Sequence, residues 1–201
     1  MFRFPTMTVA IGLIAVMIFA TVGEVSAAGR RGLRLEIYDN YSAEWDEEEW
    51  EAFEPWRDGP EGTRCAYTRV ANIDNDFNTN IGRCPTYGDY GDEEDYVGVE
   101  DILAHFTGYM KVPRSGRYTL YVRVDDGFYL KVGGKVVLKT WFDQGDRAYN
   151  DENTVVLSRG RSYKVDAWYY ENGGGDIVQL YYSLNGSEPT VVPSRWFSER
   201  P

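Results

Sequence analysis

The chain has 201 residues and a formal net charge of −11, from 32 acidic and 21 basic side chains. Nucleic acid and anionic membranes repel a chain this acidic, so neither is an expected partner, whereas divalent cations are attracted to it. The sequence has one histidine and lacks a serine nucleophile elbow, a phosphate-binding glycine loop and the ligand spacing of a zinc site. We therefore expect a binding protein rather than an enzyme.

Residues 1–27 have the pattern of a secretory signal peptide. One cation, Arg3, precedes an apolar run over residues 9–19, and small residues around Ala27 suit a signal peptidase. An uncleaved anchor is the rival interpretation, but the run is shorter than the ~20 residues that span a bilayer. We therefore expect residues 28–201 to form one domain without membrane insertion. It would be secreted, at the cell surface or in the periplasm.

The mature chain shows the period-two alternation of half-buried strands. The alternation begins at residues 33–37 and is clearest over residues 117–124. The dipeptide Gly133-Gly134 separates two short apolar runs, which is typical of a β-hairpin. Further strands are expected over residues 154–157, 162–170, 177–183 and 190–192. Strands at this spacing predict an all-β fold, an antiparallel β-sandwich of jelly-roll-like form.

Two segments depart from the strand pattern. Residues 44–56 are dense in Glu and Trp and predict a short surface helix with Trp56 facing inward. Residues 58–95 are mostly loop in character and contain both cysteines, Cys65 and Cys84. In an oxidising compartment, two cysteines indicate one disulfide. We therefore expect a loop-rich insertion that the disulfide closes.

Two predicted loops at strand ends are rich in oxygen ligands. Adjacent aspartates, Asp125 and Asp126, can converge on one ion only if the backbone leaves the extended form, and Gly127 permits such a break. The loop over residues 171–176 contains three glycines, and Asn172 and Asp176 add side-chain oxygens. Calcium takes six to eight oxygens of these kinds. The sequence is therefore consistent with a calcium site, and ordinary turn chemistry is the alternative.

Several motifs together resemble the protective-antigen-type lectin domain. They are HFTGYMKVP at residues 105–113, SGRYT at residues 115–119 and VRVDDG at residues 122–127, with LKVGGK at residues 130–135. The family includes the anthrax toxin component, yeast flocculins and epithelial adhesins, and inserts in bacterial glycosidases. The opening strand and the end of the chain fit as well, so the resemblance spans nearly the whole mature chain.

The resemblance implies a β-sandwich in which a cis peptide joins Asp125 to Asp126 and the pair holds calcium. It implies that an asparagine and backbone carbonyls complete the site and that sugar hydroxyls coordinate the ion. The metal ligands expected on this basis are Asp125, Asp126, Asn172, Gly174 and Asp176. The residues at the loop tips that we expect to contact a ligand are Gly127, Tyr129, Asp143, Gln144, Gly173 and Gly175.

The expected function is calcium-dependent carbohydrate binding, for adhesion or for the capture of a glycan or glycoconjugate. The alternative is a structural or assembly domain on a cell surface or in a matrix, which docks a surface protein without binding sugar. A hydrolase is a third interpretation. Two adjacent aspartates on one ion lie too close together for the carboxyl separation of roughly 5–10 Å that glycosidases use.

Overall fold

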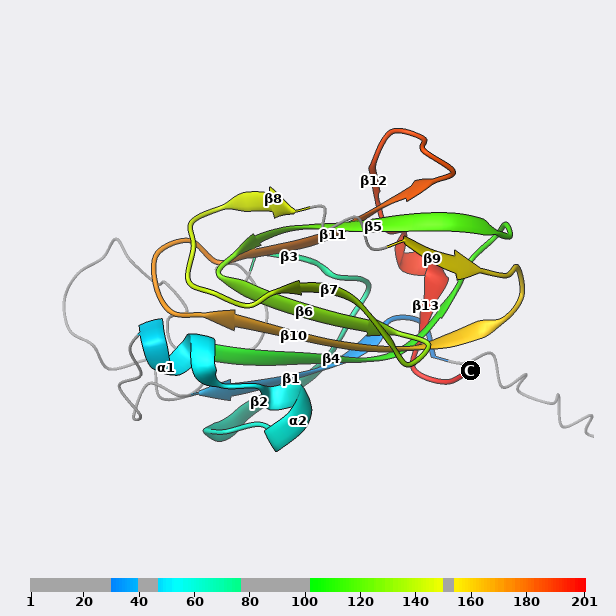
Figure 1. The fold of residues 1–201 in the computed structure, drawn as a ribbon. Helices are drawn as coiled ribbons and strands as arrows, with labels where there is room; N and C mark the ends of the chain where they lie inside the picture. The colour runs from blue at the N-terminus through cyan, green and yellow to red at the C-terminus, as the bar shows by residue number, and fades with distance from the viewer. Residues whose placement is uncertain (1–29, 40–46, 77–101, 150–153) are drawn as a thin grey trace, which may run out of the picture.

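The computed structural model describes residues 30–39, 47–76, 102–149 and 154–201 (Figure 1). The predicted signal peptide over residues 1–27 lies outside these ranges, and so does Cys84. Cys65 is half-buried in a strand, and its pairing with Cys84 stays a prediction. Within the described ranges, no helix has the length and apolar character needed to cross a membrane.

Most described residues lie in two β-sheets that pack face to face (Figure 1). The strands of the first sheet, sheet A, are β1 (Leu33–Asp39), β2 (Thr63–Val70), β4 (Ile102–Lys111), β6 (Gly127–Val132), β7 (Lys135–Thr140), β10 (Ser162–Glu171) and β13 (Phe197–Ser198). Those of the second, sheet B, are β3 (Asp74–Asp76), β5 (Gly116–Asp125), β8 (Arg147–Tyr149), β9 (Thr154–Leu157), β11 (Ile177–Leu184) and β12 (Thr190–Val191).

The strand order is β2-β1-β4-β10-β6-β7 in sheet A and β12-β11-β5-β8 in sheet B. Three short strands lie off these paths, with β13 beside β4, β3 beside β11 and β9 beside β5. Every pairing among the named strands is antiparallel. The predicted antiparallel β-sandwich is therefore confirmed.

The main core lies between the two sheets and follows from the alternation in the sequence. In β5 the residues Tyr118, Leu120, Val122 and Val124 are at most 1% exposed, whereas the side chains between them are not buried. They pack with the inward side chains of β4 and β10, such as Phe106. Each fully buried side chain of this size contributes about 1.5–3 kcal/mol to the hydrophobic free energy of folding.

A second apolar cluster covers one end of the outer face of sheet A, which is the face turned away from sheet B. Its buried members are Trp50, Leu103, Tyr129, Trp141, Trp168 and Tyr170. Two short helices cover it, α1 (Glu47–Ala52) and α2 (Pro55–Asp58) (Figure 1). The sequence predicted one helix here, and Pro55 at the first position of α2 explains the interruption because proline cannot continue a helix from the preceding turn.

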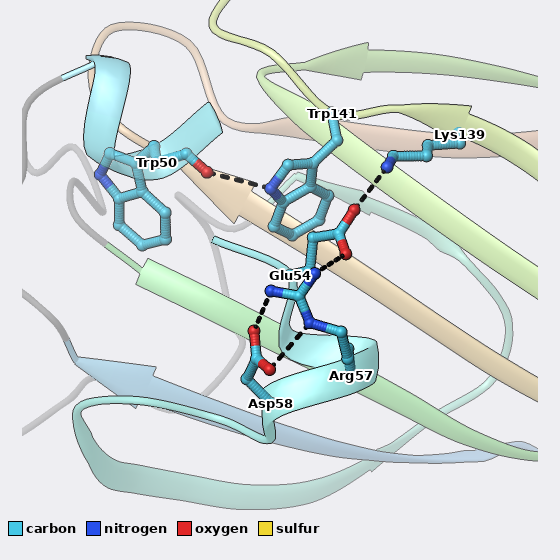
Figure 2. A network of polar contacts seen from close by, with 6 residues as sticks. All are labelled: Trp50, Glu54, Arg57, Asp58, Lys139 and Trp141. Carbon is cyan, nitrogen blue, oxygen red and sulfur yellow. Dashed lines mark hydrogen bonds and ion pairs between the residues drawn. The ribbon is translucent and has the colours of Figure 1, made fainter. Parts of the chain in front are cut away.

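Ring stacking and hydrogen bonds attach the helices to the sheet. The rings of Trp50 and Tyr170 stack with centroids 4.8 Å apart, and those of Trp56 and Tyr129 with centroids 4.1 Å apart. The indole Nε1 of Trp141 donates a hydrogen bond to the carbonyl oxygen of Trp50 over 3.0 Å (Figure 2). These contacts make the helices part of the folded domain.

At the edge of the cluster, a chain of ion pairs links α2 to the neighbouring strand. Figure 2 shows Glu54 between Lys139 of β7 and Arg57 of α2, at N–O distances of 2.8 and 2.7 Å. Arg57 also pairs with Asp58. Because these groups are exposed, the pairs orient α2 more than they stabilise the fold.

The packing of α1 predicts a stability effect at Trp50, which is fully buried. We expect Trp50→Ala to lower the free energy of unfolding by about 3–5 kcal/mol, because it removes a stacked ring and leaves a cavity. Urea unfolding measures the effect. Val156, which is 72% exposed in β9, provides the control, and Val156→Ala is expected to stay within about 0.5 kcal/mol of the original chain. Equal effects of the two substitutions would contradict the packing of α1 on the sheet.

Candidate functional site

The Asp125-Asp126 pair lies where the chain passes from sheet B to sheet A. Asp125 ends β5 in sheet B, and Gly127 begins β6 in sheet A. The peptide bond between the two aspartates is cis, as the resemblance implies. Asp125 is 7% exposed and Asp126 is 1% exposed. The pair is therefore a buried acidic step rather than a solvated turn.

A second passage between the sheets, from β10 to β11, lies beside the pair. Tyr170 of β10 pairs with Gly127, and Ile177 of β11 pairs with Asp125. These pairings fix the glycine-rich loop over residues 172–176 next to the two aspartates. The site is therefore built from two loops that are remote in the sequence and adjacent in the fold, as the sequence predicted.

A third carboxylate, that of Glu171, completes an acidic cluster. Asp125, Asp126 and Glu171 each offer a carboxylate oxygen, and these oxygens lie within 4.8 Å of one another. Sequence reasoning placed Glu171 in the loop but did not select it as a site residue. The available signal was the period of β10, in which Val165, Ala167, Tyr169 and Glu171 share the buried inward positions.

Backbone and side-chain donors hold Asp126 in place. Its Oδ1 accepts a hydrogen bond from the backbone N–H of Gln144 over 2.8 Å, and its Oδ2 accepts one from that of Asn172 over 2.9 Å. The side-chain amide of Gln144 donates to the carbonyl oxygen of Asp126. Gln144 is 8% exposed. It therefore supports the acidic pair from within, whereas the sequence predicted that it contacts a ligand.

Glu171 is also held on both of its oxygens. Its Oε1 accepts a hydrogen bond from the backbone N–H of Gly173 over 2.9 Å. The hydroxyl of Tyr169 lies 2.9 Å from Oε2 of Glu171 and 2.7 Å from the carbonyl oxygen of Asp125. Tyr169 is fully buried in the core. This hydroxyl therefore joins the end of β10 to the end of β5.

Burial and neighbouring carboxyl groups disfavour the charged form of the three carboxylates when no cation is bound. Burial, together with the adjoining carboxyl of Asp143, raises the pKa of Asp126 to about 8. Burial and the charge of Asp126 raise the pKa of Glu171 to about 10, and burial also raises the pKa of Asp125. A divalent cation reverses this electrostatic penalty, because it attracts every oxygen of the cluster.

The glycine-rich loop brings more oxygen atoms to the cluster. The side-chain amide nitrogen of Asn172 donates a hydrogen bond to Oδ2 of Asp143 over 2.8 Å, so its Oδ1 is the atom suited to a cation. A Cβ added at Gly175 would lie 3.0 Å from Oδ2 of Asp125, which places the loop backbone against that carboxylate. Asp176, 5% exposed, ends the loop.

The exposed part of the site consists of the glycine-rich loop and of the loop that follows β7. Gly173, Gly174 and Gly175 are exposed, and Gly174 has a φ of +98°, a conformation that favours glycine. Asp143 is half-buried, and Phe142 beside it is 37% exposed. These residues are the part of the two loops that reaches the surface.

Two residues predicted to contact a ligand have packing roles instead. Tyr129 is 3% exposed and its ring stacks on Trp56, so it presents no free face to a sugar. A Cβ at Gly127 would lie 2.0 Å from Cε1 of Tyr170, so this glycine allows β6 to approach β10. Trp141 and Trp168 belong to the same buried cluster.

Comparisons with solved structures give the same fold at low sequence identity. An anti-sigma factor domain-containing protein from Clostridium clariflavum is 18% identical with a TM-score of 0.59, and the match covers 98% of this chain and 53% of that one. The PA14 sugar-binding domain from an RTX adhesin is 19% identical with a TM-score of 0.58, over 86% and 99% of the two chains. The A domain of epithelial adhesin 9 from Candida glabrata, in complex with Galβ1-3GlcNAc, is 15% identical with a TM-score of 0.54, over 84% and 88%.

The chain therefore spans about half the length of the first of these proteins, 53%. No curated protein matches its sequence. The profile of the PA14 domain matches residues 62–196, which is more than half of the chain. The structural matches agree with this profile in fold, and the aspartate pair lies at the position that the resemblance implies. The chain belongs to the PA14 domain family.

Proposed function

We propose that this protein is an exported, calcium-dependent carbohydrate-binding module that acts without catalysis. The observation that carries the proposal is the cluster of three buried carboxylates, whose oxygens lie within 4.8 Å of one another. Hard oxygen donors at this density suit calcium better than the softer metals that prefer sulfur or imidazole. A cation also offsets the burial and the neighbouring carboxyl groups that raise the pKa values of Asp126 and Glu171.

The residues of both loops fit the needs of a calcium ion. Asp125, Asp126 and Glu171 supply carboxylate oxygens, and Asn172 supplies an amide oxygen. The backbone of the loop at Gly175 lies against Asp125 and offers carbonyl oxygens. Bound calcium would supply the positive charge that orients sugar hydroxyls, and the protein would fix the ion and the loop around it.

The exposed surface beside the cluster suits a sugar. Gly173, Gly174 and Gly175 leave room for a ring to approach, since a Cβ added at Gly173 or Gly174 meets nothing within 4 Å. Asp143 offers an acceptor for a hydroxyl group, and the exposed ring of Phe142 offers an apolar face. Carbohydrate binding by this chain is also supported by the two similar domains whose names refer to sugar binding or to a bound disaccharide.

The first prediction separates a metal-binding role of Glu171 from a purely structural one. In excess chelator, we expect Glu171→Gln to unfold at no lower urea concentration than the original chain, because burial already disfavours the charged form of this carboxyl and the neutral amide replaces it at nearly the same size. In calcium at about 100 times the dissociation constant, the original chain is expected to gain about 2.7 kcal/mol of unfolding free energy. The variant is expected to gain less than half of this.

The matched control for this experiment is Asp58→Asn, since Asp58 is exposed on α2 outside the cluster. It is expected to respond to calcium as the original chain does. If Glu171→Gln destabilises the metal-free protein and leaves the calcium response intact, Glu171 is a structural residue and the cluster is not the calcium site.

The second prediction concerns dependence of glycan binding on the ion. We expect excess chelator to abolish binding to a glycan array, and Asp126→Ala to abolish it in calcium, because the sugar would be held through the ion. Circular dichroism checks that the variant is folded, and Asp58→Ala is the control. Glycan binding that persists in chelator would exclude the mechanism, and binding of a surface protein without inhibition by sugars would favour the assembly alternative.

The third prediction concerns Phe142. We expect Phe142→Ala to weaken glycan binding about tenfold, because ring packing of this kind contributes about 0.5–1.5 kcal/mol beyond area burial. Calorimetry is expected to give an unchanged calcium affinity, since the ring is not a ligand of the ion. Val136→Ala, at a residue 49% exposed in β7, is the control. Equal glycan affinity of Phe142→Ala and the control would remove Phe142 from the site.

A further inference from the structure

The outer face of sheet A changes character along its strands. At the end near the acidic cluster, Tyr38, Leu103 and Tyr170 lie in one cross-strand row, which α1 and α2 cover. Towards the other end, a row of opposite residues contains Arg69, Arg34, Thr107 and Asp166. Figure 1 shows that the two helices do not extend over the far ends of these strands. The covered end is apolar and the open end is polar.

The open end contains a groove of about 620 Å³, which we call the basic groove. Its charged lining residues are Arg30, Arg34, Arg69, Lys164, Glu199 and Arg200. All five of the cations are exposed. The whole chain carries a net charge of −11, so a groove with five cations and one carboxylate has the opposite sign to the molecule that contains it.

The strand register places two of these cations directly opposite each other. Arg34 of β1 pairs with Arg69 of β2, and like charges in such a pair are destabilising. Each has one carboxylate partner, Glu36 for Arg34 at 3.0 Å and Glu199 for Arg69 at 2.8 Å. An anion between the two guanidinium groups would make this arrangement favourable.

In the part of the chain that the structure describes, the remaining cations of the groove form no close ion pair, although the charge of Lys164 acts on the carboxylate of Asp166. Among the described residues, no ion pair joins the side chain of Arg30, Lys164 or Arg200 to a carboxylate. The nearby carboxylate of Asp166 is engaged by His105, whose Nε2 lies 2.9 Å from Oδ1. The groove therefore has free capacity for anionic groups.

Aromatic rings lie among these cations. Tyr67, 61% exposed, lines the groove, and the guanidinium of Arg34 lies 5.6 Å from the centroid of its ring. Tyr109 also lines the groove and is opposite Lys164 in the register of β4 and β10. Guanidinium groups bind carboxylate or sulfate groups through paired hydrogen bonds, and tyrosine rings pack on the apolar faces of sugars.

We propose that the basic groove is a second, calcium-independent site, which binds an acidic polysaccharide bearing carboxylate or sulfate groups. Duplex DNA has one charge per ~1.7 Å of helix axis, so phosphates beyond the groove would be repelled by the acidic side chains on the rest of the molecule. A polysaccharide spaces its charges more widely and can place them on the groove alone. Lys164 and Glu171 lie near opposite ends of β10, about 20 Å apart at ~3.3 Å per residue, so the two sites are separate.

The test uses a charge-reversed variant at two of the three groove cations whose replacement breaks no ion pair. We compare the full chain with Arg30→Glu/Lys164→Glu and with the control Lys135→Glu/Arg159→Glu, which makes the same charge change at exposed residues outside the groove. The probes are heparin, which is sulfated, and polygalacturonate, which is carboxylated. Binding is measured by surface plasmon resonance at physiological ionic strength in excess chelator, which removes any contribution of the calcium site.

We expect the original chain to bind at least one of the two polysaccharides in chelator. The groove variant is expected to lose at least about tenfold in affinity, and the control less than about twofold. Calcium-dependent thermal stabilisation of the groove variant is expected to match that of the original chain, which verifies that it is folded.

Three results would overturn the proposal. One is that the original chain binds neither polysaccharide in chelator. Another is that the groove variant and the control lose affinity equally, which would indicate only the effect of net charge. The last is that duplex DNA binds as tightly as heparin and with the same loss in the groove variant, which would make the groove a nucleic-acid site.

Discussion

The burial of three carboxylates around one point is the constraint on which the site depends. Asp125, Asp126 and Glu171 lie at the two passages between the sheets, from β5 to β6 and from β10 to β11. Desolvation and repulsion oppose this arrangement, and hydrogen bonds from three backbone N–H groups and the hydroxyl of Tyr169 offset only part of the cost. A cation at this point would offset the rest of the electrostatic cost. It would also connect the two sheets at the strand ends where the chain passes between them.

The aromatic cluster under the helices sets the position of this point. The backbone carbonyl oxygen of Tyr170 accepts a hydrogen bond from the backbone N–H of Asp126 over 3.3 Å. The ring of Tyr170 occupies the space that a side chain on Gly127 would need. The same ring stacks on Trp50 of α1. Helix packing on the outer face is therefore connected to the geometry of the acidic pair through one tyrosine, although the helices contribute no carboxylate to the cluster.

The sequence predicted those features that depend on local pattern. The alternation in β5 and the Asp125-Asp126 step could be recognised because each is short and continuous. The inward position of Glu171 was missed because the sequence predicted that the strand ends at residue 170, whereas β10 continues through Glu171. Tyr129 was misassigned because β6 is buried on both faces and shows no alternation that would distinguish them. Gln144 folds back on Asp126 through contacts between separate loops, which no local pattern contains.

The basic groove illustrates the same limit on a larger scale, because its cations come from both ends of the described chain and from three strands between them. No window of the sequence is basic enough to indicate it, and the acidic composition points in the opposite direction. The fold separates the charges, with the carboxylates at one end of β10 and the cations near the other. The separation of about 20 Å exceeds the Debye length of ~8 Å at physiological ionic strength. If both proposed sites are occupied, they would therefore have little direct electrostatic effect on each other, and the molecule would hold a cation and a polyanion at the same time.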